Sequence, residues 1–262
     1  MRRNLFRNGF LILILLLFSL FASTVHAQDN YEIQVYGSDL VEPKNTMVEL
    51  HSNFTFDGSK EKINGVLPTN HVFHETIEIT HGFDKWFELG FYFFNSIGNN
   101  GRTNYVGSHL RPRIAIPKSY DLPVGLSLSA EFGFQNSKYS EDTWSIEIRP
   151  IIDKQWSKLY LSFNPTFDKS LKGPGTAEGF IFSPNFKASY AVTKAFLPGF
   201  EYYGSLGPLN NVYNWDEQQQ QLFLAVDLNV SPKWEFNAGY GFGFTSGTDK
   251  NIFKVIVGRR FK

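Results

Sequence analysis

The chain has no cysteine, only two methionines and no net charge, because 25 Lys and Arg residues balance 25 Asp and Glu residues. Without cysteine, disulfide frameworks, thiolate zinc sites and cysteine nucleophiles are excluded. Zero net charge argues against nucleic acid as a partner, since phosphate binding needs a basic surface. Aromatic side chains, in contrast, make up 17% of the 262 residues. This composition points away from an ordinary cytosolic enzyme.

Long apolar runs are absent after the N-terminus. There, three arginines precede the apolar run 10–22, and Val25 and Ala27 are small residues at the positions that a signal peptidase reads. A membrane anchor needs about 20 apolar residues, and this run is shorter. We therefore predict that residues 1–27 are a signal peptide, cleaved after Ala27. A soluble exported protein and an outer-membrane barrel both fit such a signal.

From residue 46 onward, apolar and polar residues alternate in segments bounded by turn residues, and no stretch has a helical apolar period. Each segment has about the 9–11 residues with which a tilted strand crosses a bilayer. The segments are 46–56, 70–81, 85–96, 103–116, 123–135, 143–153, 157–167, 179–190, 194–204, 219–230, 233–245 and 250–261.

The two faces of these segments differ in chemistry. In 219–230, Leu222 and Leu224 lie on one face, and Asp227 and Asn229 lie on the other. Soluble sandwiches alternate too, so the alternation alone does not decide the fold. The second face mixes glycine, serine and asparagine with many charges, which favours the inside of a closed barrel.

The connections alternate between short and long, with 97–102 and 246–249 as short exceptions. Short periplasmic turns and longer outer loops are typical of outer-membrane barrels. In lipid, strands can span only as a closed sheet, because every backbone polar group must be paired within the protein. We therefore predict an all-β fold, a transmembrane antiparallel up-and-down β-barrel of about 12 strands over residues 46–262, in the outer membrane of a Gram-negative bacterium. The longer connections are 57–69, 136–142, 168–178 and 205–218.

Residues 28–45 precede the barrel. Their alternating part, 31–36, fits either a short strand or an extended lead. We assign 28–45 as an N-terminal periplasmic lead segment.

Several short strings have a familiar form: Glu-Ile-Gln-Val-Tyr at 32–36, Glu-Leu-His at 49–51, Phe-Glu-Leu-Gly at 87–90, Pro-Gly-Phe-Glu-Tyr-Tyr-Gly at 198–204 and Val-Gly-Arg-Arg-Phe at 257–261. Together they resemble the outer-membrane barrels of the phenol-degradation meta-pathway family of transporters. The resemblance implies a barrel and the passage of small organic or aromatic compounds. The last segment also resembles the aromatic terminal strand that the outer-membrane assembly machinery recognises, although Lys262 follows Phe261.

If the polar faces point inward, acids and bases nearly balance inside the barrel. Charges in a narrow lumen of low dielectric need partners, so we expect an internal network of ion pairs. This network either satisfies the charges structurally or forms a polar constriction that selects solutes. Glu88, Glu201 and Glu235 each follow a turn lysine and are expected to form a ring near the periplasmic mouth. The lumen and constriction candidates are Glu49, His51, His74, Glu78, Glu88, His109, Arg111, Arg113, Glu131, Glu147, Arg149, Lys187, Glu201, Asp227, Glu235, Lys254 and Arg260.

Two charges, Glu75 and Arg259, fall on the apolar face. A charge at the bilayer centre is costly, so Glu75 either lies at the rim or marks a register slip of one residue.

Prolines inside predicted strands are a further signal, because proline cannot donate to a strand ladder. We expect bulges or kinks at these positions, either opening a lateral gap between about 103 and 204 or simply tolerated without a role in transport. The prolines are Pro112, Pro150, Pro165, Pro184 and Pro198.

No Gly-x-Ser-x-Gly motif is present, and we expect no enzyme. Glu49, His51, His74 and Glu78 are expected to gather inside the first hairpin, where polar lumen residues explain them better than a metal; neither metal nor cofactor is predicted. The leading function is passive uptake of small molecules, hydrophobic or aromatic ones among them, through a barrel in outer-membrane lipid. The alternatives are a partner-binding barrel without transport and a lipid-modifying barrel enzyme.

Overall fold

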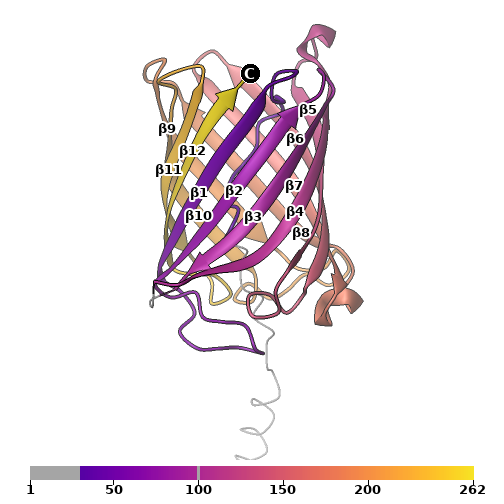
Figure 1. Cartoon of the computed structure of the whole chain (residues 1–262), viewed down its shortest axis with the longest axis vertical. Helices are drawn as coiled ribbons and strands as arrows, with labels where there is room; N and C mark the ends of the chain where they lie inside the picture. Colours follow the sequence, from indigo (N-terminus) through magenta and orange to yellow (C-terminus); the bar gives the residue numbers. More distant parts are fainter. Residues whose placement is uncertain (1–29, 99–100) are drawn as a thin grey trace, which may run out of the picture.

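The alternating segments form twelve strands, which pair antiparallel with their sequence neighbours and close where β1 pairs with β12 (Figure 1). This computed structural model describes residues 30–98 and 101–262, and the predicted signal peptide lies outside the described residues. The prediction of an all-β barrel of 12 strands is confirmed. The strands are β1 Thr46–Asp57, β2 Val72–Gly82, β3 Phe87–Ile97, β4 Thr103–Ala115, β5 Gly125–Gln135, β6 Trp144–Trp156, β7 Leu159–Lys172, β8 Ile181–Tyr190, β9 Phe196–Ser205, β10 Gln219–Leu228, β11 Trp234–Gly243 and β12 Asn251–Phe261.

Two short 3₁₀ helices, η1 (Lys118–Tyr120) and η2 (Pro174–Ala177), lie in connections. In the described part of the chain, no helix has the length and apolar character needed to cross a membrane. Two predicted strand ends are too early: β6 continues to Trp156 beyond the predicted end at 153, and β7 continues to Lys172, so the predicted loop 168–178 begins inside a strand. The cause is the pairing between these two strands, which holds Trp144 opposite Lys172 and Trp156 opposite Leu159.

The strand faces divide as the alternation predicts. On β1, Glu49, His51 and Asn53 point inward and are buried, whereas Leu50 points outward and is 43% exposed. Outward positions on the other strands are also mostly large apolar residues, such as Leu224. The barrel therefore has an apolar outer wall and a largely polar interior.

The two ends of the barrel differ. At the end called here the turn end, strands are joined mostly by short turns, and both the start of β1 and the end of β12 lie there (Figure 1). At the opposite end, called the loop end, the connections 58–71, 136–143, 173–180, 206–218 and 244–250 are mostly longer. The segment 116–124, which contains η1, is the longest connection at the turn end.

The two charges on the outer face have separate explanations. Glu75 faces outward without a register slip, paired with Ser52 on β1 and Asn95 on β3, and the Ser52 hydroxyl donates to its carboxylate at 2.7 Å. Arg259 lies at the turn end, with its guanidinium 5.2 Å from the Trp234 ring centre and 5.0 Å from that of Phe261. Such a cation among aromatics suits a membrane interface.

Three of the strand prolines form one row across the outer wall. Pro165 on β7 lies directly opposite Pro184 on β8. The β6–β7 register, which is the same on both sides of a gap between Ile148 and Ile152, places Pro150 opposite Pro165. The β6–β7 ladder is interrupted where Pro150 and Pro165, both without N–H donors, face each other, whereas the β7–β8 ladder continues through Pro165 and Pro184.

The predicted bulges at prolines are wrong. The register shifts lie instead at Thr55/Asp57, Phe94/Asn95 and Trp144/Ser145. At Pro112 the β4–β5 pairing also stops and resumes in the same register, and the β8–β9 pairing ends at Gly199, next to Pro198. The wall absorbs the missing donors as gaps in pairing without an extra residue.

Candidate functional site

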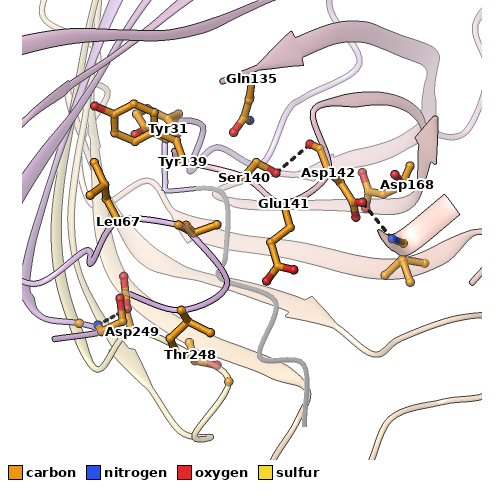
Figure 2. Close-up of a pocket in the computed structure, with 18 of the residues that line it drawn as sticks. Tyr31, Leu67, Gln135, Tyr139, Ser140, Glu141, Asp142, Asp168, Thr248 and Asp249 are labelled. Atoms are coloured by element: carbon orange, nitrogen blue, oxygen red, sulfur yellow. Dashed lines mark hydrogen bonds between the residues drawn. The ribbon is translucent and has the colours of Figure 1, made fainter. Parts of the chain in front are cut away.

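Each end of the barrel opens into a cavity. The loop-end cavity, of about 530 Å³, is lined by Tyr31, Leu67 and Tyr139 together with the acids Glu141 and Asp142 (Figure 2). The turn-end cavity, of about 720 Å³, is lined by strand residues and by residues 34–37 and 39–41. Residues that precede β1 thus line both cavities: Tyr31 lines the loop-end cavity, and residues 34–37 and 39–41 line the turn-end cavity.

The N-terminal segment 30–45 passes through the lumen from one end to the other. At the loop end, Asn30 donates to Asp249 at 2.6 Å and accepts from Asn53 at 2.8 Å. At the turn end, the Lys44 amide donates to the Gly82 carbonyl. The assignment of this segment as a periplasmic lead is therefore wrong, because its described residues fill the barrel.

Side chains of the lumen wall pair with the backbone of this segment. Thr76 donates to the Tyr31 carbonyl at 2.6 Å, Lys254 to that of Ile33 at 3.0 Å and Ser162 to that of Tyr36 at 2.6 Å. Buried backbone groups require such partners, and this stretch has no strand pairing of its own. The polar inner face thus holds an extended peptide in place of water.

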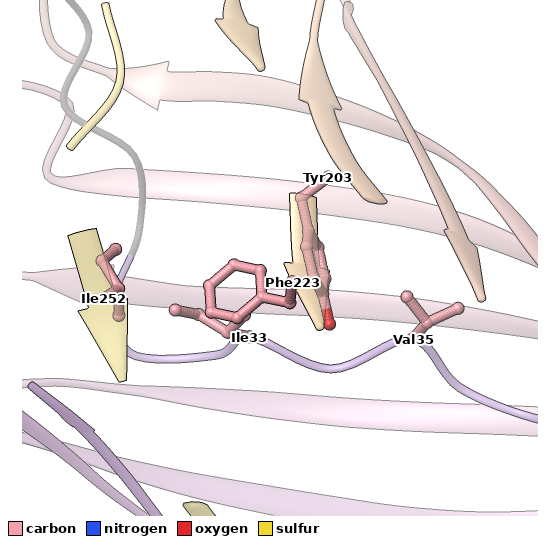
Figure 3. Packing of buried hydrophobic residues seen from close by; sticks show 5 residues of the cluster. All are labelled: Ile33, Val35, Tyr203, Phe223 and Ile252. Carbon is pink, nitrogen blue, oxygen red and sulfur yellow. The ribbon is translucent and has the colours of Figure 1, made fainter. Parts of the chain in front are cut away.

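Apolar contacts hold the same segment. Ile33 and Val35, 1% and 5% exposed, pack with Tyr203, Phe223 and Ile252 of the wall (Figure 3). A second cluster joins Tyr31 to residues of β3 and β4. Small apolar patches inside the otherwise polar lumen therefore match the apolar side chains of the segment.

Arginines surround the ring of Tyr36 at the centre of the lumen. The guanidinium carbons of Arg111, Arg113 and Arg149 lie 5.1, 5.7 and 4.9 Å from the ring centre. The Tyr36 hydroxyl donates to Glu32 at 2.7 Å. Three cations on one ring make this a tightly occupied, highly charged position.

Carboxylates balance these arginines. Arg111 binds Glu78 at 2.5 Å and Glu88 at 3.1 Å. Arg149 binds Glu32 at 3.0 Å and Glu147 at 2.7 Å. Charges this deeply buried are tolerated only with partners at this distance.

A second ionic cluster lies around Glu201, which accepts from Lys254 and, at 3.1 Å, from Lys187. Lys187 also binds Asp227 at 2.7 Å, and Asn237 donates to both acids. Because Lys254 also donates to the Ile33 carbonyl, this cluster is coupled to the N-terminal segment.

The sequence-predicted candidates lie on the inner side of the wall, and most of them are divided among several ion-pair clusters. Glu88, Glu201 and Glu235 line the turn-end cavity in three separate ion-pair clusters, with Glu235 bound to Arg260 at 2.6 Å. These three acids come from β3, β9 and β11, which are spaced around the barrel, so they surround the turn-end cavity while each carboxylate keeps its own partners.

Two of the candidate histidines, His74 and His109, contact aromatic rings of the lumen. His74 meets the Tyr31 ring edge-on, with centroids 4.9 Å apart. His109 lies 3.6 Å from Glu131 and packs edge-on against Phe94.

Sequence reasoning missed residues on both sides of the contact between the N-terminal segment and the wall. Glu32 and Tyr36 of the segment are not among the candidates, and neither is Phe223 of the wall, which is fully buried. The available signal was an aromatic on the polar face of segment 219–230. A large ring facing inward among polar residues indicates that something apolar fills the lumen.

Neither a family model nor a curated protein matches the chain. Among solved structures, the COG4313 outer membrane channel from Pseudomonas putida F1 is similar with a TM-score of 0.61 and 8% identity, over 88% of this chain and 100% of that one. The KdgM porin in complex with disordered oligogalacturonate and the NanC porin each have a TM-score of 0.52 and 10% identity, over 82% of this chain and 99% of theirs. These likenesses establish a shared barrel fold.

Proposed function

We propose that the protein is an outer-membrane channel for the passive passage of small molecules. The observation that carries this proposal is a closed barrel with an apolar outer wall, a polar interior and a cavity at each end. The structural neighbours are described as an outer membrane channel and as porins, which supports the same location and role.

We infer that the channel is closed at rest by the N-terminal segment. The stretch 31–36 lies between the loop-end and turn-end cavities and is packed on all sides. Passage then requires this stretch to move, so the wild-type protein should conduct rarely and in discrete openings.

The loop-end cavity favours small neutral or cationic aromatic solutes. Tyr31, Tyr139 and Leu67 offer apolar contacts, and Glu141 and Asp142 lie beside them (Figure 2). Acids at a channel mouth repel anions and concentrate cations. The resemblance of the sequence to the phenol-degradation family supports the aromatic part of this proposal, whereas a polyanion such as the oligogalacturonate bound to KdgM fits these acids poorly.

Planar-bilayer recording tests the proposal. We expect cation-selective current steps, reduced by benzylamine at lower concentrations than by benzoate. The Glu141→Gln variant keeps an acceptor for Asn64, which donates to Glu141 at 2.9 Å, but loses one charge at the mouth. In this variant, the concentrations of benzylamine and benzoate that reduce the current should lie closer together than in the wild type. A folded barrel without any current steps would contradict the proposal.

A second candidate is a partner-binding barrel without transport. The connection 206–218 exposes Leu209, Val212 and Trp215, each about 60% exposed. Apolar side chains at a loop tip are suited to a protein contact. This candidate gains support if no current is observed even when the N-terminal segment is weakened.

A further inference from the structure

Three ligand-type side chains of β1 and β2 form a compact cluster on the inner wall. Glu49 and Glu78 are directly opposite each other across the β1–β2 ladder, and His51 lies two residues along β1 on the same face. Their ligand atoms all lie within 4.8 Å of one another, and all three residues are buried.

Several polar atoms of this cluster are buried without a hydrogen-bond partner. They are both ring nitrogens of His51, Oε1 of Glu49 and Oε2 of Glu78. The His51 Nε2 atom is 3.5 Å from Glu78 Oε2, which is too long for a good hydrogen bond. Unpaired polar atoms at this depth are costly, so the arrangement calls for a further partner.

Among the described residues, one carboxylate of the cluster also lacks an ion-pair partner within contact distance. Glu78 and Glu88 are bound by Arg111, with Arg113 beside Glu88. In residues 30–98 and 101–262, no lysine or arginine forms an ion pair with Glu49. Two carboxylates directly opposite each other on a sheet repel unless a positive charge lies between them.

We propose that Glu49, His51 and Glu78 bind one divalent transition-metal ion, with Zn²⁺ the best match. Zinc takes imidazole nitrogen and carboxylate oxygen at about 2.0–2.2 Å, so its ligand atoms are about 3.3 Å apart in a tetrahedral site. The present separations, which are within 4.8 Å, must shorten by side-chain rotation to reach that size. The sequence alone favours ordinary lumen residues here; the unpaired atoms and the missing positive charge favour an ion.

The surroundings suit such a site. Arg111 holds Oε1 of Glu78 at 2.5 Å, which orients the carboxylate and leaves Oε2 free for the ion. Glu49 and Glu78 line the turn-end cavity, which gives an ion access and leaves a position for water. The bound ion would link β1 to β2 beside the β1–β12 seam where the barrel closes.

The test uses the folded, detergent-solubilised full-length protein after treatment with EDTA. Cobalt titration followed by visible absorption, with zinc competition and elemental analysis, should show one ion per chain and a rise in Tm with Zn²⁺. His51→Gln and Glu49→Gln should each weaken binding more than tenfold, since losing even an outer-shell partner costs about 10–100-fold. His74→Gln, a buried lumen histidine outside the cluster, is the matched control and should bind as the wild type does.

Each outcome decides the proposal. Heat-dependent gel migration identifies the variants that fold. If His51→Gln does not fold, Glu49→Gln alone tests the site. The proposal is overturned if the wild type binds no stoichiometric ion, if zinc does not raise its Tm, or if His74→Gln weakens binding as much as the cluster variants. A shared proton in place of the ion would give a pH-dependent Tm that zinc does not change, which also overturns it.

Discussion

Weakening the apolar contacts of the N-terminal segment should open the channel. Ile33→Ala and Val35→Ala together remove about five buried carbons, worth about 0.8 kcal/mol each, or about 4 kcal/mol in total. Both side chains are buried against Tyr203, Phe223 and Ile252. Because 1.4 kcal/mol corresponds to a factor of ten, the equilibrium between seated and released segment should shift about 700-fold.

The assay is the open probability of single channels in planar bilayers. A wild-type channel that is open about 0.1% of the time would become open for a large part of the recording. The hydrogen bonds to the backbone carbonyls of the segment are the same in the wild type and the variant, so the predicted change in open probability comes from the lost apolar burial.

Ile77→Ala with Ile79→Ala is the matched control, since both side chains point outward and are each 40% exposed. This pair should leave the open probability unchanged. If the folded Ile33→Ala, Val35→Ala variant opened no more often than this control, the segment would not be the gate.

Other perturbations address the ion pairs, the proline row and the loop end. Glu201→Gln deprives the buried Lys254 of its carboxylate and should lower the unfolding free energy by about 3–5 kcal/mol, measured by heat-dependent gel migration; no loss would mean that water reaches the cluster. Pro150→Val with Pro165→Val should raise the free energy of unfolding by about 1 kcal/mol for each backbone hydrogen bond restored between β6 and β7, and should slow amide exchange in β6. Unchanged exchange would rule out the prolines as the cause of the gap in the β6–β7 ladder. Burial raises the pKa of Asp249 above its usual 3.8, so the folded state binds this proton more tightly than the unfolded state does. The free energy of unfolding should therefore fall as pH rises from about 4 through the raised pKa. Asp249→Asn should flatten this pH dependence in thermal unfolding, and an equal slope in both proteins would contradict the prediction.

The sequence predicts the barrel well because the feature that indicates each strand, the alternation of apolar and polar residues, lies within that strand. Alternation along each strand determines which side chains point inward, and so Glu78 and Arg111 are found as lumen residues. Their pairing is not predictable, since they lie on β2 and β4 with β3 between them. The Arg111 side chain crosses β3 at Gly90, where the Cβ atom of any larger residue would lie 3.1 Å from its guanidinium. Only the register of three strands brings these features together.

The lumen segment escaped prediction for a different reason. Residues 31–36 alternate as a strand does, but a closed barrel has no free edge with which they could pair. Their apolar side chains contact Phe223 and Ile252, which alternation assigns to the same face as the charged residues. A mostly polar inner face gives no indication that its few apolar members match a segment elsewhere in the chain.

Apolar contacts and polar contacts both hold the closed state, although charges dominate the lumen in number. If the segment leaves, Arg111 keeps Glu78 and Glu88, and Lys254 keeps Glu201, because these pairs belong to the wall. Among the ion pairs of the described residues, those of Arg149 with Glu32 and of Lys118 with Asp39 join the segment to the wall and are lost on release. Hydrogen bonds such as those of Asp153 with Ser38 and of Glu88 with the Val41 amide are lost with them. Water replaces most of these polar contacts on release, whereas the burial of Ile33, Val35 and Tyr31 is lost outright and adds directly to the cost.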